Sequence, residues 1–134
     1  MKILLDTHIA LWAIANTTKI SNETIKILES CENEIFYSIA SVWEVSIKHM
    51  IKPKNMPISE EEFVDLCEKT KFIRLPINIE HIYNIKTLQR QSNAPKHNDP
   101  FDRILLAQAK YENLKFMTHD SLIQYYEENF IINV

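Results

Sequence analysis

Residues 99–109 join a strong helix start to an apolar helical face, in the order Asp99-Pro100-Phe101-Asp102-Arg103-Ile104-Leu105-Leu106-Ala107-Gln108-Ala109. Asp is a favoured N-cap residue and Pro is favoured at the first helical position, so a helix is predicted from Asp99-Pro100 through Glu112. Asp102 then lies in the first turn, three residues after Asp99, where the two carboxylates can face the same way. The N-terminus of this helix is therefore expected to present two acids.

Two short apolar stretches outside this helix are predicted to be strands, and both are followed closely by an acid. Leu114 to Thr118 precedes Asp120, and Met1 to Asp6 contains the continuous apolar run Ile3-Leu4-Leu5. Such a run is typical of a parallel strand that is buried on both faces. Open parallel sheets bind ligands beyond the carboxyl ends of their strands. Asp6 and Asp120 are therefore expected at one site.

The rest of the chain alternates strands with helices. Further strands are expected over Glu34 to Tyr37, Phe72 to Leu75 and Phe130 to Val134. Further helices are expected over Thr7 to Ala15, Ser21 to about Cys31, Ser38 or Ser41 to about Met50, after the capping box Ser59 and Glu62, after Asn78, and over Ser121 to Glu127. This alternation predicts an α/β fold, a single domain over residues 1–134, with a central parallel sheet of four to five short strands and helices on both faces.

The composition fits one compact domain and excludes several classes of protein. A chain of 134 residues, 46% of them hydrophobic, can bury one real core. No run approaches the ~18 consecutive apolar residues of a membrane span, and Asp6 and His8 interrupt the N-terminal apolar run too early for a signal peptide. A cytosolic protein without a membrane partner is therefore expected. Glycine is absent, which excludes the glycine-rich phosphate loops and makes Asn113 a candidate for positive φ.

The charge and the cysteines are less informative. The net charge of -3 gives no basic signal for nucleic acid. If five of the 18 acidic residues form a metal site, 13 acidic residues remain against 15 Lys and Arg. The rest of the surface would then be near neutral to slightly basic, which permits a nucleic-acid partner. Cys31 and Cys67 have no metal-binding spacing and are interpreted as buried, reduced thiols.

The five acids of the candidate site are Asp6, Glu44, Asp99, Asp102 and Asp120. Carboxylates gathered at one end of a sheet repel one another unless a divalent cation neutralises them, and hard oxygen ligands suit Mg²⁺ or Mn²⁺. Each Asp also has a simpler explanation, because Asp6, Asp99 and Asp120 can cap the helices that follow them, and Asp102 lies in a first helical turn, where an acid is favoured. Capping does not by itself predict all five acids in this order.

Glu44 lies in Ser41-Val42-Trp43-Glu44-Val45-Ser46-Ile47-Lys48, and its own simpler explanations are a capping box with Ser41 or an ion pair with Lys48. Such a pair contributes about 0.3–0.5 kcal/mol where it is exposed. Trp43 and Val45 beside it are interpreted as core residues.

Four segments carry a family resemblance when they are taken together. They are Leu4-Leu5-Asp6-Thr7-His8, Trp43-Glu44, the stretch from Asp99 to Ala109, and Thr118-His119-Asp120. In this order and spacing they resemble the PIN-domain ribonucleases, and more closely the VapC toxins of bacterial toxin–antitoxin pairs. The resemblance spans the chain, and its most specific part is the stretch from Asp99 to Ala109.

The resemblance implies roles for particular residues. The four family acids correspond to Asp6, Glu44, Asp102 and Asp120, which would be the catalytic residues. Asp99 looks like an extra acid of a subset of the family, and the metal ligands would be Asp6, Asp99, Asp102 and Asp120. Thr7 and Thr118 stand where the family often has a hydroxyl residue beside an acid. Asn113 stands where the family often has Gly, a departure that affects a turn rather than the chemistry.

The resemblance also implies an activity and partners. The protein would be an endoribonuclease that hydrolyses RNA with a water activated by Mg²⁺ or Mn²⁺, leaving a 3′-hydroxyl and a 5′-phosphate. VapC-like proteins act on structured RNA such as transfer or ribosomal RNA. An antitoxin protein silences them by occluding the acidic pocket, and they commonly form homodimers.

Two other functions were weighed against this one. A catalytically inactive PIN fold would serve as a binding module, although all four family acids are present. A receiver-type signalling domain would need an acidic neighbour beside Asp6, which the sequence lacks.

The histidines and lysines near the acids are open to more than one interpretation. His97 and His119 lie close to the acids in sequence, and a solvated or supporting role is expected for them rather than a zinc site. Contacts with phosphate are equally open for Lys48, Lys52, Lys54, Lys96 and Arg103.

Overall fold

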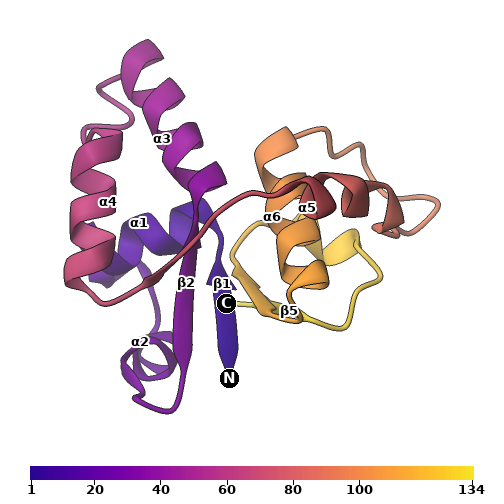
Figure 1. Ribbon diagram of the computed structural model, residues 1–134, viewed down its shortest axis with the longest axis horizontal. Coiled ribbons are helices and arrows are strands. Elements are labelled where there is room, and N and C mark those ends of the chain that lie inside the picture. Colours follow the sequence, from indigo (N-terminus) through magenta and orange to yellow (C-terminus); the bar gives the residue numbers. More distant parts are fainter.

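The structure, a computed structural model, describes residues 1–134 and is built on a five-stranded parallel sheet with helices on both faces (Figure 1). The strands are β1 (Lys2–Leu5), β2 (Glu34–Ser38), β3 (Ile73–Leu75), β4 (Lys115–Thr118) and β5 (Ile131–Asn133). Their order in the sheet is β3-β2-β1-β4-β5, and every neighbouring pair is parallel. The α/β fold predicted from the sequence is confirmed.

Side-chain caps mark the starts of most helices. The α-helices are α1 (Thr7–Ala15), α2 (Asn22–Glu29), α3 (Ile39–Ile51), α4 (Glu60–Lys69), α5 (Ile79–Asn84) and α6 (Pro100–Tyr111), and the 3-10 helices are η1 (Thr17–Lys19), η2 (Ile85–Thr87) and η3 (Ile123–Tyr125). The N-cap side chains that accept a backbone N–H bond are those of Asp6, Ser21, Ser38, Ser59, Asn78 and Asp99. These caps satisfy N–H groups that have no partner inside the helix.

The helix expected over Ser121 to Glu127 is shorter than predicted. Only Ile123–Tyr125 forms a 3-10 turn, because the residues after it bond across to another loop. Gln91 donates its backbone N–H to the carbonyl of Tyr125, and Glu127 donates to the carbonyl of Gln89. These long-range bonds use the groups that would have continued a helix.

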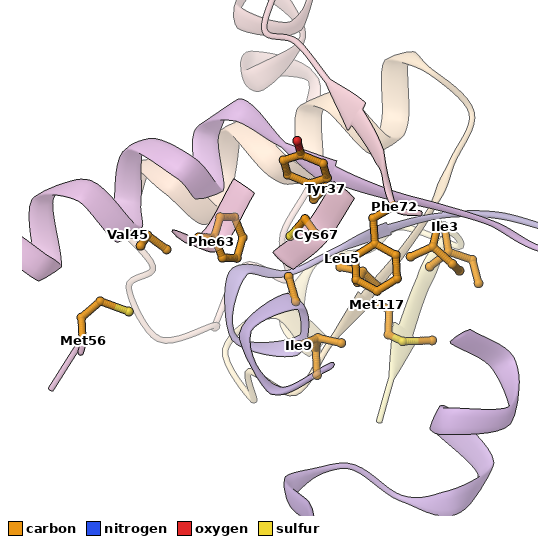
Figure 2. Packing of buried hydrophobic residues seen from close by; sticks show 12 residues of the cluster. Ile3, Leu5, Ile9, Tyr37, Val45, Met56, Phe63, Cys67, Phe72 and Met117 are labelled. Atoms are coloured by element: carbon orange, nitrogen blue, oxygen red, sulfur yellow. The ribbon is translucent and has the colours of Figure 1, made fainter. Parts of the chain in front are cut away.

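The strand pleat divides the core into two layers. Ile3 and Leu5 pack in one cluster with residues of α1, α3 and α4, shown in Figure 2, whereas Leu4 packs in a second cluster with residues of α6. Phe116 and Met117 on β4 divide between the clusters in the same way. Successive strand residues point to opposite faces, so these apolar strands are buried from both sides.

The strand order creates a switch point beside the central strand. The chain builds β2 and β3 on one side of β1, and then β4 and β5 on the other (Figure 1). In open α/β sheets the ligand crevice lies at this reversal, beyond the carboxyl ends of the strands. Asp6 directly follows β1, and Asp120 comes two residues after β4. The topology therefore brings the two acids to one crevice.

Two burial predictions from the sequence are wrong. Trp43 is 57% exposed, because α3 buries the side containing Ala40, Glu44 and Val45 and turns Trp43 outward. Cys31 is exposed in the turn after α2, whereas Cys67 is buried as expected.

The backbone contains two residues with positive φ. Asn113 has a φ of 56°, which confirms the prediction for the turn after α6, and Lys71 has a φ of 67°, which no sequence signal indicated. Separately, none of the helices combines the length and apolar character that crossing a membrane requires.

Candidate active site

Asp6 is fixed between the two central strands. Its side chain is nearly fully buried, and the hydroxyl of Thr118 donates to Oδ2 at 2.6 Å while the backbone N–H of His8 donates to Oδ1 at 3.4 Å. Burial raises the pKa of Asp6 and the charge of Glu44 adds to this, although the bond from Thr118 and the proximity of His8 oppose it. Asp6 therefore caps α1 and also lies at the carboxyl end of β1, beside the other acids.

Glu44 carries the clearest sign of a missing ligand. Its residue exposure is 2%, and only Oε2 has a partner, the ammonium of Lys48 at 2.5 Å. Oε1 is buried without any hydrogen bond. A buried polar atom without a partner is costly, so it is rare in native proteins and suggests an ion or a water that completes its coordination.

The proposed capping box of Ser41 with Glu44 is wrong, whereas the ion pair with Lys48 forms. Ser38 is the N-cap of α3, and the hydroxyl of Ser41 instead accepts a bond from the hydroxyl of Thr7 at 2.9 Å. Burial opposes the charge of Lys48, but the bond with Glu44 and nearby carboxylates outweigh it and raise the pKa of Lys48. Lys48 therefore stays charged and pairs with the carboxylate of Glu44.

Asp99 and Asp102 occupy different positions at the start of α6. Asp99 is the N-cap, and its Oδ1 accepts from the backbone N–H of Phe101 at 2.9 Å and of Asp102 at 3.2 Å. Asp102 is buried in the first turn. Burial raises the pKa of Asp102 to about 8, and the charges of the other four acids add to this shift, in the order Asp6, Asp99, Glu44 and Asp120. All five predicted acids thus lie in one electrostatic neighbourhood.

Thr118 links the acids that follow β1 and β4. Its hydroxyl donates to Asp6 and accepts the backbone N–H of Asp120 at 3.0 Å. The carboxylate of Asp120 in turn accepts from the backbone N–H of Leu122 at 2.8 Å. Asp120 is half-buried, so one side of its carboxylate remains available to solvent or a ligand.

His97, for which the sequence analysis expects a solvated or supporting role, is buried and contacts Asp102. Its Nε2 lies 3.0 Å from Oδ2 of Asp102, and its Nδ1 lies 2.8 Å from the hydroxyl of Tyr126. Burial lowers the pKa of His97, which favours the neutral ring. With Asp102 ionised, the consistent arrangement has Nε2–H donating to Asp102 and the Tyr126 hydroxyl donating to Nδ1. The only sequence signal was the position of His97 five residues before Asp102.

The tightest group of ligand atoms is formed by His97, Asp102 and Asp120, within 4.8 Å of one another. Asp6 and Glu44 stand around this group and act on it through their charge. The donors are mostly hard oxygens, and a cation would relieve the crowding of charge at Asp102. The buried Oε1 of Glu44 is a further oxygen without a partner. The residues therefore fit a divalent cation such as Mg²⁺ or Mn²⁺.

Asp99 offers a test that separates capping from charge. Asp99→Ala should lower the free energy of unfolding by about 1 kcal/mol, because α6 loses its N-cap, whereas Asp99→Asn should keep the cap. Melting curves of the two variants measure this difference. Equal stability of Asp99→Ala and the parent protein would contradict the capping role, and any activity that Asp99→Asn loses would report charge or metal contact.

Comparisons with known proteins identify the family and the fold of the chain. A model of the PIN domain matches residues 3–128. No curated protein matches the chain. Among solved structures, the chain is similar to VapBC2 from Rickettsia felis, which was solved bound to a DNA fragment from the VapBC2 promoter. The TM-score is 0.69 at 15% identity, and the match covers 100% of this chain and 99% of that chain.

Two further structures share the fold. VapBC-1 from nontypeable Haemophilus influenzae has a TM-score of 0.59 at 18% identity and covers 93% of this chain and 92% of its own. A domain of a functionally unknown protein from Methanocaldococcus jannaschii has a TM-score of 0.53 at 15% identity. That match covers 99% of this chain and 90% of the other chain. Identities this low show the fold alone. Because the family model spans nearly the whole chain, the protein belongs to the PIN domain family.

Proposed function

We propose that this protein is a metal-dependent endoribonuclease that acts in the cytoplasm as the toxin of a toxin–antitoxin pair. The observation that carries the proposal is the buried carboxyl of Asp102, surrounded by four further acids at the switch point of a PIN-fold sheet. Carboxylates this close together repel one another, so they can all be ionised at once only when a cation neutralises part of their charge. The sequence segments that resemble VapC toxins and the fold shared with VapBC2 and VapBC-1 support the same family of functions.

The acids would have distinct roles in this reaction. Asp6, Asp102 and Asp120 would hold Mg²⁺ or Mn²⁺, with Asp99 close by, and Glu44 would hold a second ion or orient the attacking water. A bound divalent cation lowers the pKa of its water and neutralises charge on the phosphate.

The residues around the acids would hold them in place. Thr118 fixes one oxygen of Asp6, and His97, held by Tyr126, fixes one oxygen of Asp102. Lys48 holds one oxygen of Glu44 and adds positive charge at the edge of the site. Such supporting bonds orient ligands and raise their affinity for a metal.

Two partners belong to the proposal besides RNA. A cognate antitoxin protein would occlude the acidic pocket, and two copies of the chain would form a homodimer, both by resemblance to VapC proteins. The alternative of an inactive binding module remains, although all four family acids are retained. Because the PIN domain model matches residues 3–128, the receiver-type signalling domain is excluded as an alternative.

The test is cleavage of structured RNA, such as a transfer RNA pool, by purified protein in Mg²⁺. We expect fragments with 5′-phosphate and 3′-hydroxyl ends, and no cleavage by Asp6→Asn prepared in the same way. Folded parent protein that binds RNA tightly without cutting it would instead support the binding module.

A further inference from the structure

A pocket with aromatic walls opens directly beside the acids. It has a volume of about 260 Å³ and is lined by Asp6, His8, Trp12, His119 and Asp120. Two of these are proposed metal ligands, and the other three are ring side chains from α1 and from the segment after β4. Pockets for drug-sized ligands begin at roughly 300 Å³, so this pocket suits a smaller group.

The rings of Trp12 and His119 have contacts that orient them, and the exposed ring of His8 lies against Trp12. The centroids of Trp12 and His119 lie 5.5 Å apart with their planes at 66°, and those of Trp12 and His8 lie 6.1 Å apart at 54°. Nδ1 of His119 lies 2.5 Å from the carbonyl of Val134, and Trp12 is half-buried against the core. Rings already ordered before a ligand arrives lose little conformational entropy when they bind it.

The charges around the pocket indicate what kind of group would enter it. A cation held by Asp6 and Asp120 would attract the phosphate, and the ring-lined part of the pocket beside them favours a flat and neutral group against Trp12. The ammonium of Lys19 lies over the Trp12 ring, 6.0 Å from its centroid. Lys19 is exposed and can meet a phosphate that follows such a group.

We propose that this pocket, named here the Trp12 pocket, binds one unpaired nucleobase of the RNA, adjacent to the phosphate that is cut. The inference rests on the proposed nuclease function. A phosphate placed over the acids brings its neighbouring base beside the Trp12 pocket, because Asp6 and Asp120 belong to both. Aromatic side chains bind unstacked bases of single-stranded loops, and each stack contributes about 1–3 kcal/mol. Trp12 is then a positioning residue for substrate.

The first experiment measures cleavage kinetics on an RNA hairpin that is cut at one site in its loop. Versions that lack the base on either side of that site are compared with the intact RNA, using parent protein and Trp12→Leu. We expect one missing base to raise KM about tenfold, within roughly 5- to 160-fold, with little change in kcat. Trp12→Leu should raise KM equally on intact RNA and show no further rise on that base-free RNA.

Two variants control for structural damage. Trp12→Phe keeps an aromatic face and should retain most of the affinity. Tyr83→Leu removes an exposed aromatic ring from α5, outside the Trp12 pocket, and should leave KM unchanged. Effects of Trp12→Leu and base removal that simply multiply would overturn the proposal, because the two changes would then act on separate contacts.

A second experiment does not depend on cleavage. The chain has two tryptophans, so Trp43→Phe leaves Trp12 as the only indole fluorophore. Binding of a single-stranded RNA tetramer in Mg²⁺ should quench its emission, and a base-free sugar-phosphate tetramer should not. Base-dependent quenching without any cleavage would refute the nuclease function while supporting base binding. Equal emission with both tetramers would refute the Trp12 pocket, whether or not RNA is cut.

Discussion

Asp102→Asn should reduce the rate of RNA cleavage by more than about a hundredfold. Loss of a residue that only supports a metal ligand already costs roughly 10- to 100-fold, and Asp102 is proposed to be a ligand itself. The amide oxygen can still accept the bond from His97, so the local structure should be kept. Initial rates on a structured RNA in Mg²⁺ measure the effect.

The same variant should make the metal-free protein more stable at alkaline pH. The pKa of Asp102 is raised to about 8 from an ordinary value of 3.8, so between these values the folded state binds more protons than the unfolded state. The stability contributed by this group is therefore complete below about pH 4 and lost as the pH rises through 8. Asn does not ionise, so Asp102→Asn should melt higher than the parent protein in EDTA at pH 8.5, with a smaller difference at pH 5.

Asp65→Asn is the matched control for both measurements. Asp65 lies exposed on α4 and pairs with Lys69, at 2.8 Å, away from the acids. Exposed pairs of this kind contribute about 0–1 kcal/mol, so neither cleavage nor the pH profile of melting should change appreciably. Normal cleavage by Asp102→Asn would mean that the third acid of the site has been assigned to the wrong residue.

Chelation of divalent cations should abolish RNA cleavage, and added Mg²⁺ or Mn²⁺ should restore it. The expectation follows from the hard oxygen ligands of the site and from the unpartnered Oε1 of Glu44. Rates are compared in excess EDTA and after re-addition of each metal. Full activity in excess chelator would contradict the metal-dependent mechanism.

Metal binding should also appear in the melting temperature. A cation at a hundred times its dissociation constant would stabilise the folded state by about 2.7 kcal/mol, provided that it does not bind the unfolded chain. The increase should be smaller in Asp102→Asn, which offers one charge fewer, and unchanged in Asp65→Asn. An equal increase in all three proteins would indicate binding elsewhere on the surface.

Most of the fold could be predicted because the signals are local. The helix over Thr7 to Ala15 was predicted with its observed bounds, since Asp6 caps it and β1 ends directly before it. The sequence predicts too long a helix after Asp120, because the backbone of this segment forms hydrogen bonds with residues 89–91, far away in the sequence. Trp43 was placed in the core because it is apolar, although the rotation of α3 decides its exposure.

In the site too, local sequence patterns reveal some residues, whereas contacts between residues far apart in the sequence cannot be predicted from them. Asp6, Asp99, Asp102 and Asp120 could be found because each stands near a strand end or at a helix start, whereas Glu44, inside α3, could be found only from the resemblance to a known family. The spacing of Glu44 and Lys48 suggested their pair, but not that one partner is buried and the other partly exposed. The contact of His97 with Tyr126 joins residues 29 positions apart, which no local pattern indicates.

The bond from Thr118 to Asp6 spans 112 positions in the sequence, and this separation governs when the acidic group can exist during synthesis of the chain. A growing polypeptide that has emerged only as far as β3 contains β1 and Glu44, but not α6 or β4. Contacts this distant close a long loop, so they form late in folding. A ribosome-bound chain therefore carries no assembled group of acids until α6 and β4 have both been synthesised.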